Sequence, residues 1–537
     1  MTRLLSCGAA SAISLLLPLI GRAEVGGARL FPLTSVRLTG DGPFARAVEA
    51  NRDYLLDLDP DRLLAPFLRE AGLRPKAPPY GNWESMGLDG HTAGHYLSAL
   101  SMMIASGADT PDGKLAKRLD SMLDELEGVQ KANGNGYLGG VPGGKAMWKD
   151  VANGKINAHG FGLNDKWVPL YNIHKTFAGL RDAYQIAGRE KAKSLLVNFG
   201  DWAADLVSRL SDEQVQAMLT SEHGGMNEVL ADIAAITGDE KYLELAKRFN
   251  HHAILDPLID QRDELTGKHA NTQIPKVIGL ERIATLTGDA RADAGAEFFW
   301  QDVVGKRTIA FGGNSVSEHF NDPRDFHGML EHREGPESCN TYNMLRLTEQ
   351  LFERHPKAEY ADFYERALFN HILSAIDPGH PGYVYFTPLR PAHYRVYSTP
   401  EKSFWCCVGS GMENPGKYGK FIYALAPDGL YVNLFIASEL KTSPRGLKLR
   451  QETKFPFEEK SVLILDPPQP RTFTLHLRHP DWVAEQDFKV TIHGEDARIS
   501  SEPGSYAAIR REWEAGDRVE VALPMRTRVE ELPDGSD

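Results

Sequence analysis

Three cysteines and a glutamate form the most distinctive chemical pattern of the chain. Cys339 lies in the stretch GPESCNTYN, and Cys406 and Cys407 are adjacent in SFWCCVGSG. Glu337 stands two residues before Cys339, and alternate residues of an extended segment project to the same side. One carboxylate and three thiolates make a closed tetrahedral set suited to Zn²⁺. The pattern therefore predicts that these four side chains bind one zinc ion.

Three simpler roles for the cysteines stay open on spacing alone. The thiols can simply be buried, because free cysteine behaves as a small hydrophobic residue. Cys406 and Cys407 can form a strained vicinal disulfide, or the zinc can be purely structural. An ordinary disulfide framework is excluded, since an odd number of cysteines follows residue 23 and two of them are adjacent.

The N-terminus has the pattern of a signal peptide. Arg3 precedes an apolar stretch from Ala9 to Ile20, and small residues follow near Gly21. We therefore expect residues 1–23 to be removed and the protein to be exported, to the periplasm or the medium. A retained N-terminal anchor is the alternative. No later segment reaches the roughly 18 apolar residues of a transmembrane helix, so no membrane span is expected.

Length and charge limit the class of protein. A chain of 537 residues exceeds the size of one hydrophobic core, so at least two domains are expected. The 60 basic and 73 acidic residues give a net charge of −13, which argues against nucleic acid or an anionic membrane as the partner. A neutral substrate fits better.

Residues 41–420 are predicted to form a helical domain, preceded by an N-terminal segment at 24–40. Apolar residues recur with helical period, and Gly188, Gly238 and Gly288 follow one another at regular intervals. Glycine is the residue expected just past a helix C-terminus, so each interval fits one pair of antiparallel helices. A ring of such pairs makes a toroid.

A histidine stands about four turns before each of these glycines. The three histidines are His174, His223 and His269, and His91 before Gly107 is a weaker fourth instance. If equivalent helices are parallel neighbours, their N-terminal ends share one rim, and the histidines converge there in a polar pocket. The alternative is that each histidine is a local capping or core residue.

The pattern changes to β-structure after about Tyr418. Short alternating runs such as LYVNLFI, SVLILD, TFTLHL, FKVTIHG and RVEVAL are separated by Pro, Gly and Asp. They predict a β-sandwich over residues 421–537. The chain stops at Asp537 soon after a strand, which indicates either a small sandwich or a truncated one.

Several stretches together resemble the β-L-arabinofuranosidase family of zinc- and cysteine-dependent glycoside hydrolases. They are NGYLGG, WVPLYNIHKTFAGLRDAY, KHANTQIPK, FGGNSVSEHF, PESCNTYNMLRLTEQLF and SFWCCVGSGMENPGKYGKFIY. The resemblance runs from about Val36 to the end and implies an (α/α)6 toroid followed by β-sandwich domains, although further strands usual in the family are missing here. It also implies zinc ligands at Glu337, Cys339, Cys406 and Cys407, a nucleophile at Cys406, an acid/base at Glu318, and substrate contacts at His174, His223 and His269. The surroundings of His174 match the family least.

The resemblance implies a retaining hydrolase that releases terminal L-arabinofuranose, most simply β-linked, from plant-type glycans. Cys406 would attack the anomeric carbon, and Glu318 would protonate the departing oxygen and later activate water. From the sequence alone Glu318 ranks no higher than its acidic neighbours Asp322 and Asp325. Tyr385 and Trp405 are candidates for a ring face against the sugar.

Two other functions remain open. The zinc can be structural while two carboxylates among Asp89, Glu222 and Glu228 perform an inverting hydrolysis or a lyase-type elimination. The chain can also be a carbohydrate-binding protein without turnover, against which the intact glutamate and cysteine set argues.

Overall fold

The computed structural model describes residues 27–110, 112–377, 379–380, 382–442 and 446–536. The expected signal peptide lies outside the described residues. Within these ranges, no helix combines the length and the apolar character needed to cross a bilayer.

Six inner helices pack side by side in a closed ring. They are α3 (His91–Ser106), α6 (Pro169–Gln185), α9 (Met226–Thr237), α12 (Ala270–Thr287), α15 (Ser338–Arg354) and α17 (Cys406–Lys417). Each contacts the next along the chain, and α17 returns to contact α3. Their side chains are mostly buried because each helix has neighbours on several sides.

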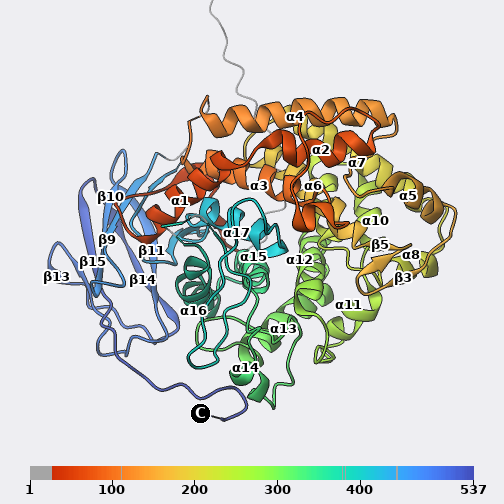
Figure 1. The fold of residues 1–537 in the computed structure, drawn as a ribbon. Helices are drawn as coiled ribbons and strands as arrows, with labels where there is room; N and C mark the ends of the chain where they lie inside the picture. The colour runs from red at the N-terminus through yellow and green to blue at the C-terminus, as the bar shows by residue number, and fades with distance from the viewer. Residues whose placement is uncertain (1–26, 111, 378, 381, 443–445, 537) are drawn as a thin grey trace, which may run out of the picture.

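An outer layer of helices surrounds the ring. It consists of α1 (Pro43–Asp57), α4 (Lys114–Asn133), α7 (Glu190–Val207), α10 (Glu240–Arg248), α13 (Ala290–Lys306) and α16 (Ala358–Ala367). An outer helix returns the chain between successive inner helices, so the inner helices run in one direction and their N-terminal ends share one rim. The predicted mainly helical (α/α)6 domain is confirmed (Figure 1).

Glycines end the inner helices as predicted. Gly107, Gly238 and Gly288 are the C-cap residues of α3, α9 and α12, with φ of 84°, 72° and 74°. These left-handed conformations cost glycine little and other residues more. Gly188 has φ of 69° and lies shortly after the end of α6.

Shorter elements occupy the connections. They are α2 (Pro60–Glu70), α5 (Gly144–Ala152), α8 (Asp212–Met218), α11 (His252–Ile259), α14 (His327–Glu331) and a small sheet of β3 (Ala158–His159), β4 (Gly162–Leu163) and β5 (Lys166–Trp167).

Two sheets form the second part of the molecule, which lies beside the helical ring (Figure 1). The first has the order β1 (Arg29–Leu30), β6 (Tyr423–Leu425), β7 (Gly429–Val432), β11 (Arg471–His479) and β14 (Ser505–Trp513). The second has the order β13 (Glu495–Asp496), β12 (Val490–Ile492), β15 (Asp517–Ala522), β10 (Lys460–Asp466), β9 (Lys448–Thr453), β8 (Ser438–Lys441) and β2 (Val36–Leu38). Leu475 of the first sheet and Leu463 of the second belong to one hydrophobic core, as in a sandwich.

The segment ahead of the helical domain belongs to these sheets. β1 pairs with β6 and β2 with β8, both antiparallel. Strands of two and three residues are too short to show an alternating pattern, so this pairing could not be predicted from the sequence.

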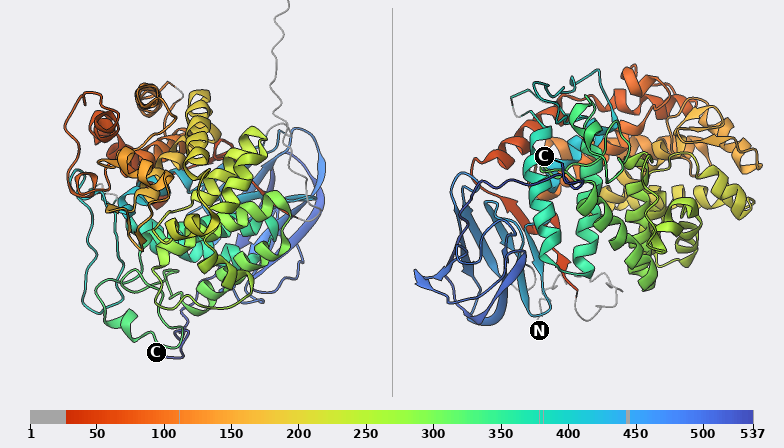
Figure 2. Two further views of the ribbon diagram at one scale, coloured as in Figure 1. Left: turned by 90° about the vertical axis from the view of Figure 1, so that its right-hand side faces the viewer. Right: turned by 90° about the horizontal axis from the view of Figure 1, so that it is seen from below.

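Arg478 of β11 joins the sheets to the helices. Its side chain is fully buried, and it donates to the carbonyl of Asn433 at 2.6 Å, to Asp362 Oδ1 at 2.5 Å and to Glu365. Both acidic residues lie on α16, so one buried cation links the two parts of the molecule. Figure 2 shows the same side-by-side arrangement from two further directions.

Candidate active site

The three cysteines lie at the N-terminal ends of two neighbouring inner helices. Cys406 and Cys407 are the first residues of α17, and Cys339 is the second residue of α15. Glu337 is the N-cap of α15 with an extended backbone (φ −82°, ψ 134°). All four side chains are buried. The positive end of a helix dipole favours a thiolate, so both helices favour anionic sulfur here.

The donor atoms of these four residues face one centre, with all of them within 4.8 Å of one another. The Sγ atoms of Cys406 and Cys407 are 3.8 Å apart, and each lies 3.5 Å from Glu337 Oε1. A disulfide requires about 2.05 Å, so both cysteines are free thiols. Glu337 Oε2 is buried and has no hydrogen-bond partner among the described residues. The cluster can hold a metal ion.

Packing four acidic groups together opposes the ionisation of three of them. The hydrogen bond with Cys339 raises the pKa of Cys406, and burial raises the pKa of Cys407 and of Glu337. Burial also acts to raise the pKa of Cys339, but hydrogen bonds from the other two thiols outweigh it and lower that pKa to about 7. A bound cation is what such a group needs to become fully anionic.

Glu318 approaches the cluster on a strained loop. It has φ of 69° and its neighbour Ser317 has φ of 46°, conformations that cost about 1–3 kcal/mol each in residues other than glycine. Two backbone hydrogen bonds hold the loop: Ala270 N–H donates to the Glu318 carbonyl at 2.7 Å, and Ser317 N–H donates to the Glu334 carbonyl at 2.9 Å.

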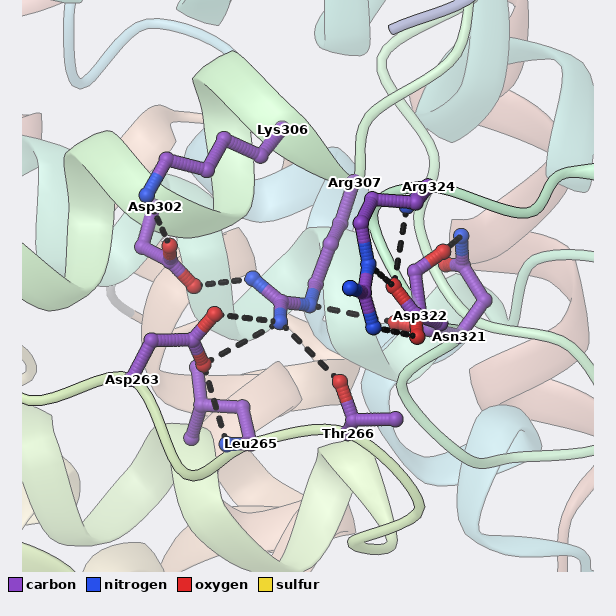
Figure 3. A network of polar contacts seen from close by, with 9 residues as sticks. All are labelled: Asp263, Leu265, Thr266, Asp302, Lys306, Arg307, Asn321, Asp322 and Arg324. Carbon is purple, nitrogen blue, oxygen red and sulfur yellow. Dashed lines mark hydrogen bonds and ion pairs between the residues drawn. The ribbon is translucent and has the colours of Figure 1, made fainter. Parts of the chain in front are cut away.

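Arg307 anchors the far side of this loop (Figure 3). The fully buried guanidinium pairs with Asp302 at the end of α13 and with Asp263 at 2.8 Å. Its Nε donates to the carbonyl of Asn321 at 3.3 Å. Since Asn321 is three residues after Glu318, the network fixes the loop to the ring.

The Glu318 carboxylate has two donors. Tyr385 Oη donates to Oε1, and His269 Nε2 lies 3.5 Å from Oε2. Burial acts to raise the pKa of Glu318, but these two hydrogen bonds outweigh it and the pKa is lowered. Burial acts to lower the pKa of His269, and Glu318 and Glu222 outweigh it, so that pKa is raised. Each of the two groups therefore favours the charged form of the other.

Two of the predicted histidines lie close to the cysteine and glutamate cluster. His269 is the N-cap of α12, and its Nε2 is within 4.8 Å of donor atoms of Glu318 and Glu337. His174, near the start of α6, lines a cavity of about 30 Å³ together with Cys339. Both of its ring nitrogens are buried without a partner in the described structure, so they are available for a ligand or water.

The other two histidines lie further round the rim. His223 stands three residues before α9, its Nδ1 lies 3.1 Å from the Ser221 carbonyl, and its ring contacts His251. Its Nε2 has no partner in the part of the chain described. His91 begins α3 and pairs with Glu84 at 2.8 Å. All four histidines thus stand at or near the N-terminal ends of inner helices.

The three alternative carboxylates differ in their surroundings. Asp89 pairs with Arg69 at 2.8 Å, and Glu228 pairs with Arg181 at 3.2 Å and with Arg346. Glu222 is buried, and its pKa is raised by burial in spite of the nearby charge of His269. Of the three, Glu222 is the one that interacts with the Glu318 and His269 pair: its charge raises the pKa of His269, and the charge of Glu318 raises the pKa of Glu222.

Comparison with known proteins identifies the family. Residues 35–420 match the model of the β-L-arabinofuranosidase GH127 catalytic domain, and residues 429–525 match that of the GH127 middle domain. The chain belongs to the GH127 β-L-arabinofuranosidase family. It is therefore a glycoside hydrolase, as the sequence motifs predicted.

Relatives within GH127 are distant in sequence and close in fold. The chain is 25% identical over 464 residues to the non-reducing end β-L-arabinofuranosidase of Bifidobacterium longum subsp. longum, covering 77% of this chain and 68% of that protein. The structure of the GH127 β-L-arabinofuranosidase Ara127N from Geobacillus stearothermophilus T6 has a TM-score of 0.72 at 20% identity, covering 93% of this chain and 82% of that one. The GH127 β-arabinofuranosidase BT3674 has a TM-score of 0.72 at 22% identity, with 93% and 81% covered.

Sequence reasoning missed three contacts in this GH127 site. Ser410 Oγ lies 3.1 Å from Cys339 Sγ, and its position one turn after Cys406 was the available signal. Tyr171 belongs to the same buried cluster as the three cysteines and stands three residues before His174, on the same helix face. Tyr385 was expected to offer only its ring, whereas its hydroxyl binds Glu318.

Proposed function

We propose that this GH127 enzyme releases terminal β-linked L-arabinofuranose from plant-type glycans with retention of anomeric configuration. Cys406 is the nucleophile and Glu318 the acid/base. The observation that carries the proposal is a set of four metal donors beside a carboxylate that stands on a separate, anchored loop.

Zinc fits the spacing of the donor set. In a tetrahedral site with Zn–S bonds of about 2.3 Å and Zn–O bonds of about 2.0 Å, two sulfurs lie ~3.8 Å apart and a sulfur and an oxygen ~3.5 Å apart. The distances here are 3.8 Å between the Cys406 and Cys407 sulfurs and 3.5 Å from each to Glu337 Oε1. Glu337, Cys339, Cys406 and Cys407 would hold the ion. When bound, zinc keeps its thiol ligands ionised near neutral pH and lowers their basicity.

The reaction proceeds by two displacements. Cys406 Sγ attacks the anomeric carbon, the C–S bond forms as the bond to the leaving oxygen breaks, and Glu318 gives that oxygen its proton. Water then loses a proton to Glu318 while its oxygen displaces the sulfur, which recovers its electron pair. Two inversions at one carbon give net retention. Glu318 carries a proton before the first step, and His269, which lies 3.5 Å from its carboxylate, supplies that proton and takes it back after the second step.

Cys406 is favoured over Cys407 as the nucleophile for two reasons. Its side chain retains 7% exposure, whereas Cys407 has none. The Tyr385 hydroxyl, which binds Glu318, also acts on the pKa of Cys406 in the lowering direction. Cys406 therefore lies on the acid/base side of the cluster.

The three histidines are proposed to hold the hydroxyls of the sugar. His174 and His223 carry buried ring nitrogens without partners in the described structure, and a neutral imidazole offers one donor and one acceptor. Burial lowers the pKa of both rings well below the usual range. They therefore stay neutral and can bind hydroxyls at the working pH.

A second candidate mechanism rests on Glu222. Its buried carboxyl has a raised pKa beside Glu318, and two carboxylates in separate roles can support inverting hydrolysis. Proton NMR of the first-formed sugar separates the mechanisms. Retention supports the cysteine mechanism, and inversion favours the pair of carboxylates.

A screen of aryl glycosides with and without a chelator tests the proposal. We expect about one equivalent of zinc in the purified protein and turnover of the β-L-arabinofuranoside that the chelator abolishes. Less than about half an equivalent of zinc, without chelator in the purification, would contradict the metal assignment. Turnover of a hexoside or uronide alone would contradict the substrate.

Export to the periplasm or the medium is a further part of the proposal. It rests on the N-terminal sequence, with Arg3 ahead of the apolar stretch. Cell fractionation and N-terminal sequencing of the mature protein test it, and a cytoplasmic protein that retains residues 1–23 would contradict it.

A further inference from the structure

A groove of about 340 Å³ opens next to the candidate active site, within the size range of small-molecule sites. Its walls are mostly aromatic or apolar with a few polar groups, and the residues that line it include Tyr385, Phe386, Pro388, Tyr394, Val396 and Trp405. Tyr394 is 71% exposed and Val396 55%. Exposed apolar side chains gathered along a hollow are typical of a binding surface.

The groove is continuous with the catalytic machinery. Tyr385 lines it and donates its hydroxyl to Glu318. Glu334 lines it too, and its carbonyl accepts from the N–H of Ser317, the residue before the acid/base. Trp405, which packs near Tyr385 with ring centroids 6.0 Å apart, immediately precedes Cys406. The groove therefore begins beside the residues proposed as nucleophile and acid/base.

The position of Glu318 decides which half of the substrate lies there. A general acid must reach the oxygen of the leaving group, so that group extends past Glu318. Beyond Glu318 and Tyr385 the chain offers this groove. We infer that the groove binds the leaving-group part of the substrate, and that this part is a sugar ring. This inference rests on the proposed function.

A sugar matches the groove better than a fully apolar or a charged group. One face of a sugar ring presents C–H groups, which pack on the rings of Tyr394, Phe386 and Trp405. Its edge presents hydroxyls, and Arg333, Glu334 and His393 stand in the lining as polar partners. A flat apolar ligand would leave these polar groups unpaired, and one cation beside one anion favours neither sign of charge.

Tyr394→Ala tests the assignment, because the residue is exposed and lies outside the proposed catalytic set. Three substrates are compared: a disaccharide with terminal β-L-arabinofuranose, the p-nitrophenyl β-L-arabinofuranoside and the methyl β-L-arabinofuranoside. We expect kcat/KM for the disaccharide to fall by at least about fivefold, mainly through KM, since one stacking partner is lost. The kcat/KM for the methyl glycoside should change by less than about twofold, because its leaving group has no ring to stack on Tyr394.

Phe457→Ala is the matched control, since Phe457 is 77% exposed on the β-domain between β9 and β10. This variant should leave kcat/KM unchanged for all three substrates. Val396→Arg, which narrows the groove, should likewise lower kcat/KM for the disaccharide but not for the methyl glycoside. Unchanged melting temperatures show that the Tyr394→Ala and Val396→Arg variants fold.

Four results would decide against the inference or its basis. Equal losses on all three substrates, or none on the disaccharide, would overturn it. A loss confined to the aryl glycoside would overturn the choice of a sugar. If the wild-type enzyme hydrolyses none of the three substrates, the proposed function itself fails, and the groove is not the cause.

Discussion

The Glu318 side chain is held by one tyrosine and one histidine on a backbone that only a well-anchored loop can maintain. Glu318→Gln keeps the size of the side chain and an oxygen for Tyr385, but the amide cannot donate the proton. We expect zinc content and melting temperature to stay unchanged while hydrolysis of substrates with poor leaving groups slows by about a hundredfold or more.

An activated aryl glycoside should lose less in its first step with this variant, because its leaving group needs no proton. Steady-state kinetics over a series of leaving groups measures the difference. Equal losses across the series, or none, would locate the acid elsewhere.

Ser410 contacts one of the four proposed metal ligands without being a ligand itself. Its hydroxyl lies 3.1 Å from Cys339 Sγ, and such outer contacts orient metal ligands and stabilise the thiolate. Ser410→Ala should weaken zinc binding by about tenfold to a hundredfold, as measured by competition with a chromophoric chelator. Ser410→Thr keeps the hydroxyl and should restore most of the affinity. An alanine variant with wild-type affinity would show that the contact is incidental.

The loop that carries Glu318 depends on the end of α13. Arg307 is fully buried there and joins Asp302, Asp263 and the Asn321 carbonyl (Figure 3). Breaking a buried ion pair from one side costs about 3–5 kcal/mol. Arg307→Gln should therefore lower the free energy of unfolding by a value in this range and slow hydrolysis of poor leaving groups, because the loop loses its anchor.

Lys306→Met is the control for this element, since Lys306 pairs with the same Asp302 but its side chain is 54% exposed. It should cost less than about 1 kcal/mol and leave activity intact. Urea unfolding and kinetics of both variants check the prediction. Wild-type activity in a destabilised Arg307→Gln variant would show that the network stabilises the helical ring but does not position Glu318 for catalysis.

A buried carboxyl of α12 makes stability depend on pH. Burial, reinforced by the charge of Asp293 on α13, raises the pKa of Glu281 to about 8. The folded state then holds a proton that the unfolded state releases above about pH 4.5, so this group removes stability as pH rises from there through about 8. Glu281→Gln removes this pH-dependent loss of stability, because the amide does not ionise.

The variant should therefore gain stability relative to wild type between pH 5 and pH 8, by on the order of a few kcal/mol. Urea unfolding at both pH values measures the difference, with the exposed Glu240→Gln as the control. A difference between variant and wild type that does not change with pH would mean that Glu281 ionises in the folded state as it does in water.

At the scale of the whole molecule, the helix pairs and the long strands could be predicted from the sequence, but the short strands that complete the two sheets could not. Recurrent glycines predicted the helix pairs, because a helix end with positive φ selects glycine. Alternating runs predicted the long strands. The pairing of β1 with β6 and of β2 with β8 was not predictable, since these strands are very short and their partners lie far along the chain.

The candidate site shows the same division. The histidines were predictable because each stands near the start of an inner helix, and the ring brings those starts to one rim. The cysteine cluster was predictable because one carboxylate and three thiolates are a set suited to zinc. Tyr385 and Glu318 meet through two loops whose course depends on tertiary contacts such as the anchor at Arg307. The sequence contains no periodic pattern for such loops, so the resemblance to a family was needed to find Glu318.

Covalent labelling tests the central claim most directly. An electrophilic sugar with the configuration of β-L-arabinofuranose should react once per active site, and peptide mapping by mass spectrometry should find the label on Cys406. This readout avoids substituting Cys406, which under the proposal is a metal ligand and the nucleophile at once. A label on Cys407 would reverse only the choice within the pair, whereas a label on an aspartate or glutamate would contradict the cysteine mechanism.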